Sequence, residues 1–108
     1  MLDERICPKF EQATALLGKR WTGLIIESLL SGATRFSEIA QLIPQVSDRM
    51  LAERLRELEG SDIISRGVYP EIPVRIEYRL TKKGEALKPV LEAMHHWADV
   101  WVETTEVQ

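Results

Sequence analysis

Cys7 is the residue of this chain with the clearest chemical potential. It is the single cysteine and directly precedes Pro8, a residue that suits the first position of a helix because its missing N–H would be unpaired there. The partial positive charge of a helix start, with Arg5 and Lys9 close in sequence, favours the thiolate and predicts a lowered thiol pKa. Such a thiolate suits a redox or electrophile sensor, and an inert buried cysteine is the alternative. Oxidation would give an intersubunit disulfide, a mixed disulfide with a small thiol, or an adduct.

A second group of residues carries charge in a pattern that suits DNA. Opposite a stripe of Leu51, Leu55 and Leu58, one face of a predicted helix carries arginines and glutamates. Arginine can pair bidentately with guanine, and the N–H groups of a helix start can hold a phosphate. The alternative is that these charges form solvated pairs one turn apart. The residues from which we expect DNA contacts, on this helix, the preceding one and a hairpin, are Arg35, Ser37, Ser47, Arg49, Glu53, Arg56 and Arg75.

Hydrophobic spacing predicts the helices that position these side chains. Over the first sixty residues, apolar side chains recur at helical spacing and each run stops at glycine or proline. The expected helices span residues 8–18, 21–30, 38–43 and 48–59. Ser37 and Ser47 are the expected N-caps of the third and fourth, because a serine hydroxyl accepts a hydrogen bond from the first turn.

The pattern then changes to a period of two. Residues 63–69 and 74–80 are predicted strands, and the two prolines between them lie outside the paired region, at the hairpin tip. Thr81 is expected to cap a long last helix over residues 82–103, in which Pro89 marks a kink or a late start. The order helix, helix, helix, helix, strand, strand, helix is mainly α with a small β-hairpin. Two short helices followed at once by a hairpin make a winged helix-turn-helix.

The last predicted helix carries more apolar surface than a domain of 108 residues can cover. Two tryptophans one turn apart favour a two-fold dimer through the first and last helices, although part of the stripe must pack on its own domain. His95 and His96 are neighbours that point about 100° apart on a helix, so we expect a polar face there, no metal site and no cofactor. The expected interface residues are Phe10, Leu87, Leu91, Met94, Trp97 and Trp101.

Composition excludes several classes of protein. With 44% hydrophobic and 29% charged residues, the chain has a globular balance, and we expect one domain over residues 1–108 with a core over about 7–102. No apolar run is long enough to span a membrane and the charged start is no signal peptide, so we expect a soluble cytoplasmic protein. The net charge of −3 argues against a DNA-binding protein, because such proteins usually carry an excess of basic residues. However, residues 85–108 hold one basic and five acidic residues against eight and seven in 47–84, which predicts DNA binding with weak non-specific affinity.

Several motifs occur in order and without gaps between Cys7 and Val102. They are Cys7-Pro8, Leu17-Gly18-Lys19-Arg20-Trp21, Arg35-Phe36-Ser37-Glu38-Ile39, Met50-Leu51, Arg54-Leu55-Arg56-Glu57-Leu58-Glu59, Tyr69-Pro70-Glu71-Ile72-Pro73-Val74-Arg75-Ile76-Glu77-Tyr78 and Leu80-Thr81-Lys82-Lys83-Gly84. As a set they resemble the HxlR-type transcriptional regulators. The resemblance implies a bacterial winged-helix protein that binds DNA as a homodimer.

The sequence is most similar to the quinone- and catechol-responsive repressors of that family. The resemblance implies that the cysteine matching Cys7 is a thiol switch that responds to quinones, diamide or hypochlorite-type stress. Some of those repressors carry additional C-terminal cysteines, which this chain lacks. The pairing partner of Cys7 on oxidation is therefore open.

We therefore expect a transcriptional regulator, a repressor rather than an enzyme, that reads a palindromic operator and is switched at Cys7. Half-sites lie about one DNA turn (~34 Å) apart, so re-packing the dimer would abolish paired docking. One alternative is a protein-interaction module that uses the face of residues 87–101, and another is a ligand-responsive regulator without a redox switch. A thiol enzyme built on Cys7 with His95 or His96 lacks an evident acid to orient the histidine.

Overall fold

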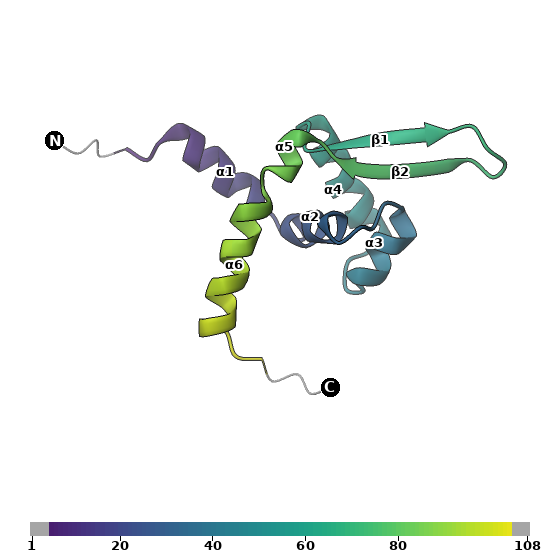
Figure 1. Ribbon diagram of the computed structural model, residues 1–108. Helices are drawn as coiled ribbons and strands as arrows, with labels where there is room; N and C mark the ends of the chain where they lie inside the picture. Colours follow the sequence, from purple (N-terminus) through teal and green to yellow (C-terminus); the bar gives the residue numbers. More distant parts are fainter. Residues whose placement is uncertain (1–4, 105–108) are drawn as a thin grey trace.

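The computed structural model describes residues 5–104, so the ends of the predicted domain, 1–4 and 105–108, lie outside the described residues. Its first four helices are α1 (Pro8–Gly18), α2 (Thr22–Leu30), α3 (Phe36–Leu42) and α4 (Asp48–Gly60). An antiparallel hairpin of β1 (Ile64–Tyr69) and β2 (Arg75–Leu80) follows, and then α5 (Lys82–Glu85) and α6 (Lys88–Trp101). The predicted mainly α fold with a small hairpin is confirmed. We call the hairpin, residues 64–80, the wing; it projects from one side of the body formed by α2, α3 and α4 (Figure 1).

The core forms where α2, α3 and α4 meet the start of β1. The leucine stripe predicted on α4 is fully buried, since residues three and four apart share one face of a helix. Thr34 extends the edge of the wing, because its carbonyl accepts a hydrogen bond from the N–H of Tyr78 at 2.7 Å. The buried apolar residues are Ile25, Ile26, Leu29, Ile39, Ile43, Val46, Leu51, Leu55, Leu58, Ile63, Ile64 and Leu91.

The third helix begins two residues earlier than the sequence predicts. The Glu38 carboxylate accepts hydrogen bonds from the N–H groups of Thr34 at 2.9 Å and Arg35 at 3.0 Å. These two backbone donors, which lie just before the helix, therefore have a partner. Arg35 therefore occupies the N-cap position, and the prediction that Ser37 caps this helix is wrong. The second helix, in contrast, begins one residue later than the sequence predicts, at Thr22.

The predicted long last helix over residues 82–103 is in fact two helices. α5 ends at Glu85, and α6 begins with Pro89 in its first turn. Proline cannot complete a hydrogen bond inside a helix, so Pro89 marks a late start and not a kink. Thr81 caps only the short α5, where its Oγ accepts a hydrogen bond from the N–H of Gly84 at 3.1 Å.

Gly84 allows α5 to pack directly against the root of the wing. A Cβ atom at this position would lie 2.2 Å from the carbonyl oxygen of Ile63 and 2.9 Å from Cδ2 of Leu80. The same carbonyl accepts a hydrogen bond from the N–H of Thr81 at 3.0 Å. Only glycine permits this close approach of α5 to the start of β1.

Helices α1 and α6 project away from the body on the side opposite the wing (Figure 1). The radius of gyration is 16.1 Å, whereas a compact domain of this length has about 13 Å. α1 buries no residue and α6 buries only Leu91. Leu91 thus belongs to the core of its own chain, which corrects its prediction as an interface residue; Leu87 is half-buried against the same core.

Candidate functional site

The first turn of α4 presents an arginine to solvent at a capped helix start. Ser47 is the N-cap, as predicted, and its Oγ accepts a hydrogen bond from the N–H of Met50 at 3.1 Å. The Arg49 side chain is exposed, and within residues 5–104 it makes no hydrogen bond or ion pair. Glu53, the expected partner of Arg49 one turn away, lies 3.5 Å from Arg54 instead. Arg49 is therefore available to a ligand outside the chain.

Arg54 anchors α4 to the loop between α1 and α2, a role that sequence reasoning missed. Its side chain is only 12% exposed. Its Nε donates a hydrogen bond to the carbonyl of Arg20 at 2.9 Å, and its Nη1 pairs with Glu57 at 3.3 Å. Glu57 also pairs with Lys19 at 3.1 Å. The one cue in the sequence is that Arg54 follows Leu51 by three residues, which places it beside the buried stripe.

Within the wing, Arg75 is held by two carboxylates. Its Nη2 lies 2.9 Å from Glu71, and its Nη1 donates a hydrogen bond to Glu77. The guanidinium carbon lies 4.0 Å from the centre of the Tyr69 ring, which the strand register places opposite Arg75. The sequence predicts Arg75 as a contact to DNA or as an exposed arginine at the strand end, but the structure places it in this network.

The pKa of each carboxylate in the network is lowered. The hydrogen bond from Arg75 lowers the pKa of Glu71, because it stabilises the charged form. The pKa of Glu77 is lowered too, first by Arg79 and then by Arg75. The Arg79 Nη2 lies 2.7 Å from the Glu77 carboxylate.

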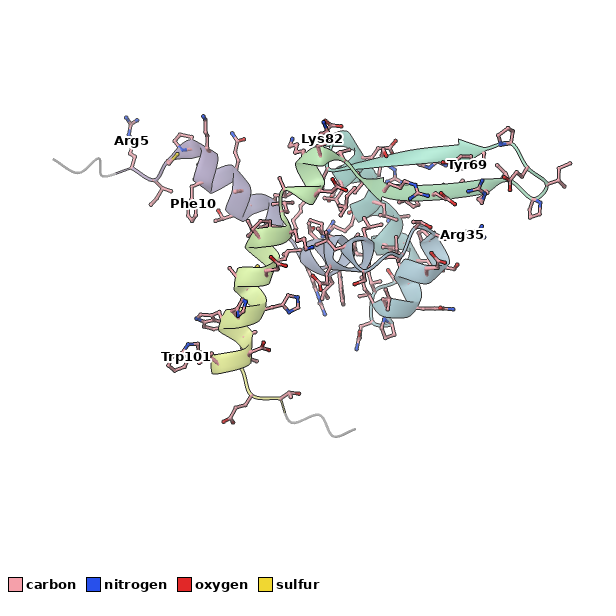
Figure 2. All side chains as sticks on the ribbon, viewed as in Figure 1. Arg5, Phe10, Arg35, Tyr69, Lys82 and Trp101 are labelled. Carbon is pink, nitrogen blue, oxygen red and sulfur yellow. The ribbon has the colours of Figure 1, made fainter. Side chains whose placement is uncertain are left out.

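A groove separates the start of α3 from the tip of the wing. It has a volume of about 500 Å³, and its lining includes Arg35 and Ser37 on one side and Glu71 and Arg75 on the other. Arg35 points from the body towards the wing side of the molecule (Figure 2). The structure thus brings three of the predicted DNA contacts, Arg35, Ser37 and Arg75, around one groove. The other four predicted contacts lie at the start of α4 and along it.

Cys7 occupies the N-cap position of α1 and is exposed, as a reactive thiol requires. Its side chain makes no capping hydrogen bond. Nevertheless, the backbone N–H groups of Phe10 and, to a smaller degree, Lys9 lower its pKa. The predicted direction is confirmed, and the cause is the backbone donors of the helix start.

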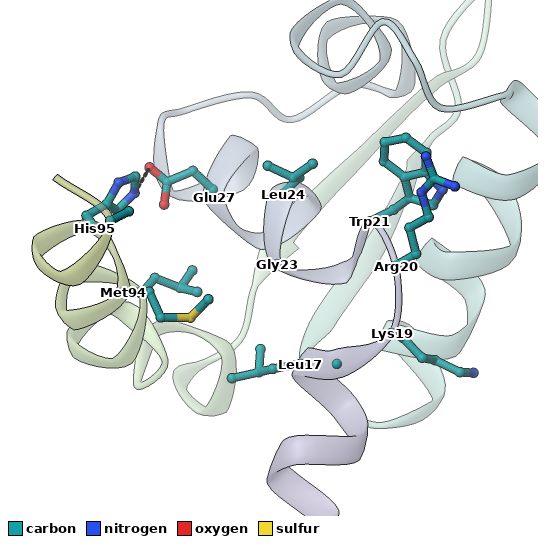
Figure 3. A pocket seen from close by; sticks show the side chains of 12 residues that line it. Leu17, Lys19, Arg20, Trp21, Gly23, Leu24, Glu27, Met94 and His95 are labelled. Carbon is teal, nitrogen blue, oxygen red and sulfur yellow. Dashed lines mark ion pairs between the residues drawn. The ribbon is translucent and has the colours of Figure 1, made fainter. Parts of the chain in front are cut away.

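A cleft of about 460 Å³ lies where the end of α1 meets α2 and α6. Leu17, Leu24 and Met94 line it, as Figure 3 shows. The His95 Nε2 atom lies 3.1 Å from the Glu27 carboxylate, and this contact joins α6 to α2 beside the cleft (Figure 3). Within residues 5–104, no three His, Cys, Asp or Glu side chains gather in a way that suits a metal ion.

An apolar stripe runs along α6 and is exposed. Trp97 and Trp101 are 62% and 70% exposed, and Met94, one turn before Trp97, is exposed as well. Phe10 of α1 is 61% exposed. Phe10 and Trp101 both project into the open angle between α1 and α6 in the view of Figure 2. Exposed aromatic side chains therefore occur on both α1 and α6.

No helix among residues 5–104 is both long and apolar enough to cross a bilayer.

Known proteins with similar sequences and structures are helix-turn-helix transcriptional regulators. The sequence profile described as HxlR-like helix-turn-helix matches residues 16–106. The HTH-type transcriptional regulator YodB of Bacillus subtilis (strain 168) is 54% identical over 98 residues, which cover 91% of this chain and 88% of YodB. The structure of reduced YodB superposes with a TM-score of 0.80 at 52% identity, over 94% of this chain and all of that one. The structure of quinone-bound YodB superposes with a TM-score of 0.77 at 50% identity, over 89% and 100%.

Proposed function

The chain belongs to the HxlR-like helix-turn-helix family of transcriptional regulators, and on that premise we propose that it is a homodimeric repressor that reads a palindromic operator and is switched at Cys7. The observation that carries the proposal is the exposed Arg49, without a partner among residues 5–104, at the capped start of α4. The proposal includes no catalytic role, and as a regulator of bacterial operons the protein would act in the cytoplasm.

In this proposal α4 is the recognition helix in the major groove. Arg49 pairs with a guanine edge, and Ser47 with the helix start holds a phosphate. Glu53 and Arg56 extend the contact along α4. Arg35, Ser37 and Arg75 contact the backbone or the minor groove around the wing, for which Arg75 must leave at least one of its carboxylate partners.

We propose that the dimer forms through α1 and α6, with Phe10, Met94, Trp97 and Trp101 at the interface and Leu87 at its margin. Three exposed aromatic side chains per subunit would bury on the order of 800 Å² across a two-fold interface. That area is smaller than the roughly 1,200 Å² or more that a specific interface buries. The cleft lined by Met94 continues the same apolar surface and would supply further buried area. Sedimentation tests this step, because Trp97→Ala with Trp101→Ala should give monomers. A double variant that sediments as the wild-type dimer would refute the interface.

We propose that a quinone or another electrophile or oxidant modifies the Cys7 thiolate and releases the operator. The exposed thiol with a lowered pKa supports this step, as does the existence of a quinone-bound structure of the relative YodB. Because Cys7 lies within one turn of Phe10, an added group would re-pack the α1 side of the dimer. That change alters the separation of the two recognition helices.

DNA binding is tested by selecting operator duplexes from a random pool and measuring affinity by fluorescence anisotropy. Arg49→Ala should weaken operator binding by roughly 5–150-fold per half-site, the equivalent of about 1–3 kcal/mol. Lys88→Ala on α6 is the matched control, since it also removes one exposed charge. Equal affinities of the two variants would overturn the role of Arg49. Binding without a steep salt dependence would instead favour a protein-interaction module.

The switch is tested with Cys7→Ser. This variant should bind the operator like the wild type and should stay bound after treatment with p-benzoquinone. A non-reducing gel and the intact mass of the treated wild type distinguish an intersubunit disulfide from an adduct. Release of the Cys7→Ser protein by quinone would eliminate Cys7 as the sensor.

A further inference from the structure

Each nitrogen of the Arg75 guanidinium donates a hydrogen bond to a carboxylate of its own wing. Its Nε lies 3.2 Å and 3.3 Å from the two Glu71 oxygens, and its Nη2 lies 2.9 Å from one of them. Its remaining nitrogen, Nη1, donates to Glu77. A planar fork paired with a carboxylate in this way is also the arrangement in which arginine binds a phosphate. Glu71 thus occupies the position that a DNA phosphate would take.

The two carboxylates around Arg75 differ in how firmly they are held. The Glu77 side chain is 10% exposed and is shared between Arg75 and Arg79. The Glu71 side chain is 54% exposed, lies at the wing tip and pairs with Arg75 alone among the hydrogen bonds of residues 5–104. Stacking of the guanidinium on the Tyr69 ring also keeps it in place. Glu71 is therefore the partner that can leave while Arg75 stays oriented.

The network also offsets the charge of two of the three arginines of the wing, and Arg66 on β1 lies outside it. Arg75 and Arg79 are matched by Glu71 and Glu77, and the pKa of each carboxylate is lowered, so both are charged at neutral pH. The Glu71 side chain is 54% exposed and that of Arg75 only 27%, so the carboxylate is the more accessible of the two to a phosphate in the groove. Arg75 and Arg79 therefore attract DNA of arbitrary sequence only weakly.

We propose that Glu71 is a specificity-determining residue that acts as an internal substitute for phosphate: it holds Arg75 until DNA displaces it. The inference rests on the proposed DNA-binding function and goes beyond it by assigning Glu71 a role in rejecting non-operator DNA. On an operator, α4 docks by its base contacts and holds a phosphate against the wing long enough to replace Glu71. On other sequences those base contacts are missing, and Arg75 stays with Glu71.

The test is non-specific binding, measured with a labelled 30-base-pair duplex of random sequence over a range of salt concentrations. Glu71→Gln keeps the size of the side chain but removes the charge that competes with phosphate. We expect this variant to bind the random duplex roughly three- to tenfold more tightly at low salt. The slope of log K against log salt should steepen by about 0.9 per subunit, the equivalent of one added phosphate contact. Glu71 is exposed, so the unfolding temperature should not change.

Two further variants separate this mechanism from a general change in charge. Glu92→Gln on α6 also removes one exposed negative charge, but far from the wing, and should leave the salt slope unchanged. In the double variant Glu71→Gln, Arg75→Ala, the gain should disappear because no guanidinium is left to take up the phosphate. The proposal is overturned if Glu71→Gln binds the random duplex no better than Glu92→Gln, or if the gain persists without Arg75.

Failure of this inference and failure of the proposed function give different results. If the wild type binds a selected operator but Glu71→Gln leaves random-duplex binding unchanged, only the role of Glu71 is wrong. If the wild type binds neither duplex and Glu71→Gln binds neither, DNA binding itself is wrong.

Discussion

Gly84→Ala is the substitution that tests the packing of the structure most directly. The added methyl group would lie 2.2 Å from the carbonyl oxygen of Ile63, well inside the 3.0 Å below which Cβ contacts essentially do not occur. The obstacle is backbone and not the end of a flexible side chain. Either α5 or the root of β1 must therefore move by about 1 Å.

The cost of that movement has two parts. Forcing an extra methyl group into a packed site costs about 1–3 kcal/mol. The same carbonyl accepts hydrogen bonds from the N–H of Thr81 at 3.0 Å and from the Thr81 hydroxyl at 3.1 Å. Each of these hydrogen bonds that is lost costs about 0.5–1.5 kcal/mol of stability. We expect a total loss of about 3 kcal/mol, which lowers the unfolding temperature by roughly 12 °C or more in a domain of this size.

The assay is thermal unfolding by circular dichroism at one fixed protein concentration, because dimerisation makes the unfolding temperature depend on concentration. Gly60→Ala is the matched control, since no atom lies within 4 Å of its added Cβ and alanine is favoured in a helix. Its unfolding temperature should equal or exceed that of the wild type. A Gly84→Ala protein that unfolds within about 2 °C of the wild type would refute the close approach of α5 to Ile63.

Three further predictions follow from single residues. Leu91→Ala should cost about 2–5 kcal/mol of stability in a denaturant titration, because Leu91 is the buried residue of α6; a loss no larger than that of its exposed neighbour Glu92→Ala would contradict this. The alkylation rate of Cys7 by iodoacetamide should rise with pH to a midpoint below the ordinary thiol pKa of about 8.5, and a midpoint at or above that value would show that the helix start does not activate the thiol. The pKa of Glu38 is lowered, chiefly by the backbone N–H groups of Thr34 and Arg35, so its contribution to stability is present above the unfolded pKa of about 4.3 and is lost as pH falls. The wild type should therefore unfold at a higher temperature than Glu38→Gln at pH 7, and the two should converge towards pH 3, whereas a constant difference would refute the linkage.

Local sequence determined most of the elements and the cap of α4. Apolar spacing placed the helices and the hairpin, and Ser47 caps α4 because a serine hydroxyl reaches the first turn of its own helix. The lowered pKa of Cys7 was equally predictable, since it depends on backbone donors two and three residues away. Prediction failed where two local signals competed. Arg35 and not Ser37 is the N-cap of α3, because the Glu38 carboxylate accepts hydrogen bonds from the N–H groups of Thr34 and Arg35.

Only the tertiary structure decided how the charged side chains of the candidate site are used. Arg54 and Arg20 lie 34 residues apart and meet only when α4 packs beside the α1–α2 loop. The strand register sets Arg75 opposite Tyr69, while Glu71 reaches it across the hairpin turn, so the pairing depends on the bend of the chain and not on any helical spacing. Arg49, in the same kind of sequence environment, keeps no partner within residues 5–104. An arginine's availability to DNA depends on which carboxylates folding brings within about 4 Å of it, and that distance is a property of the folded chain.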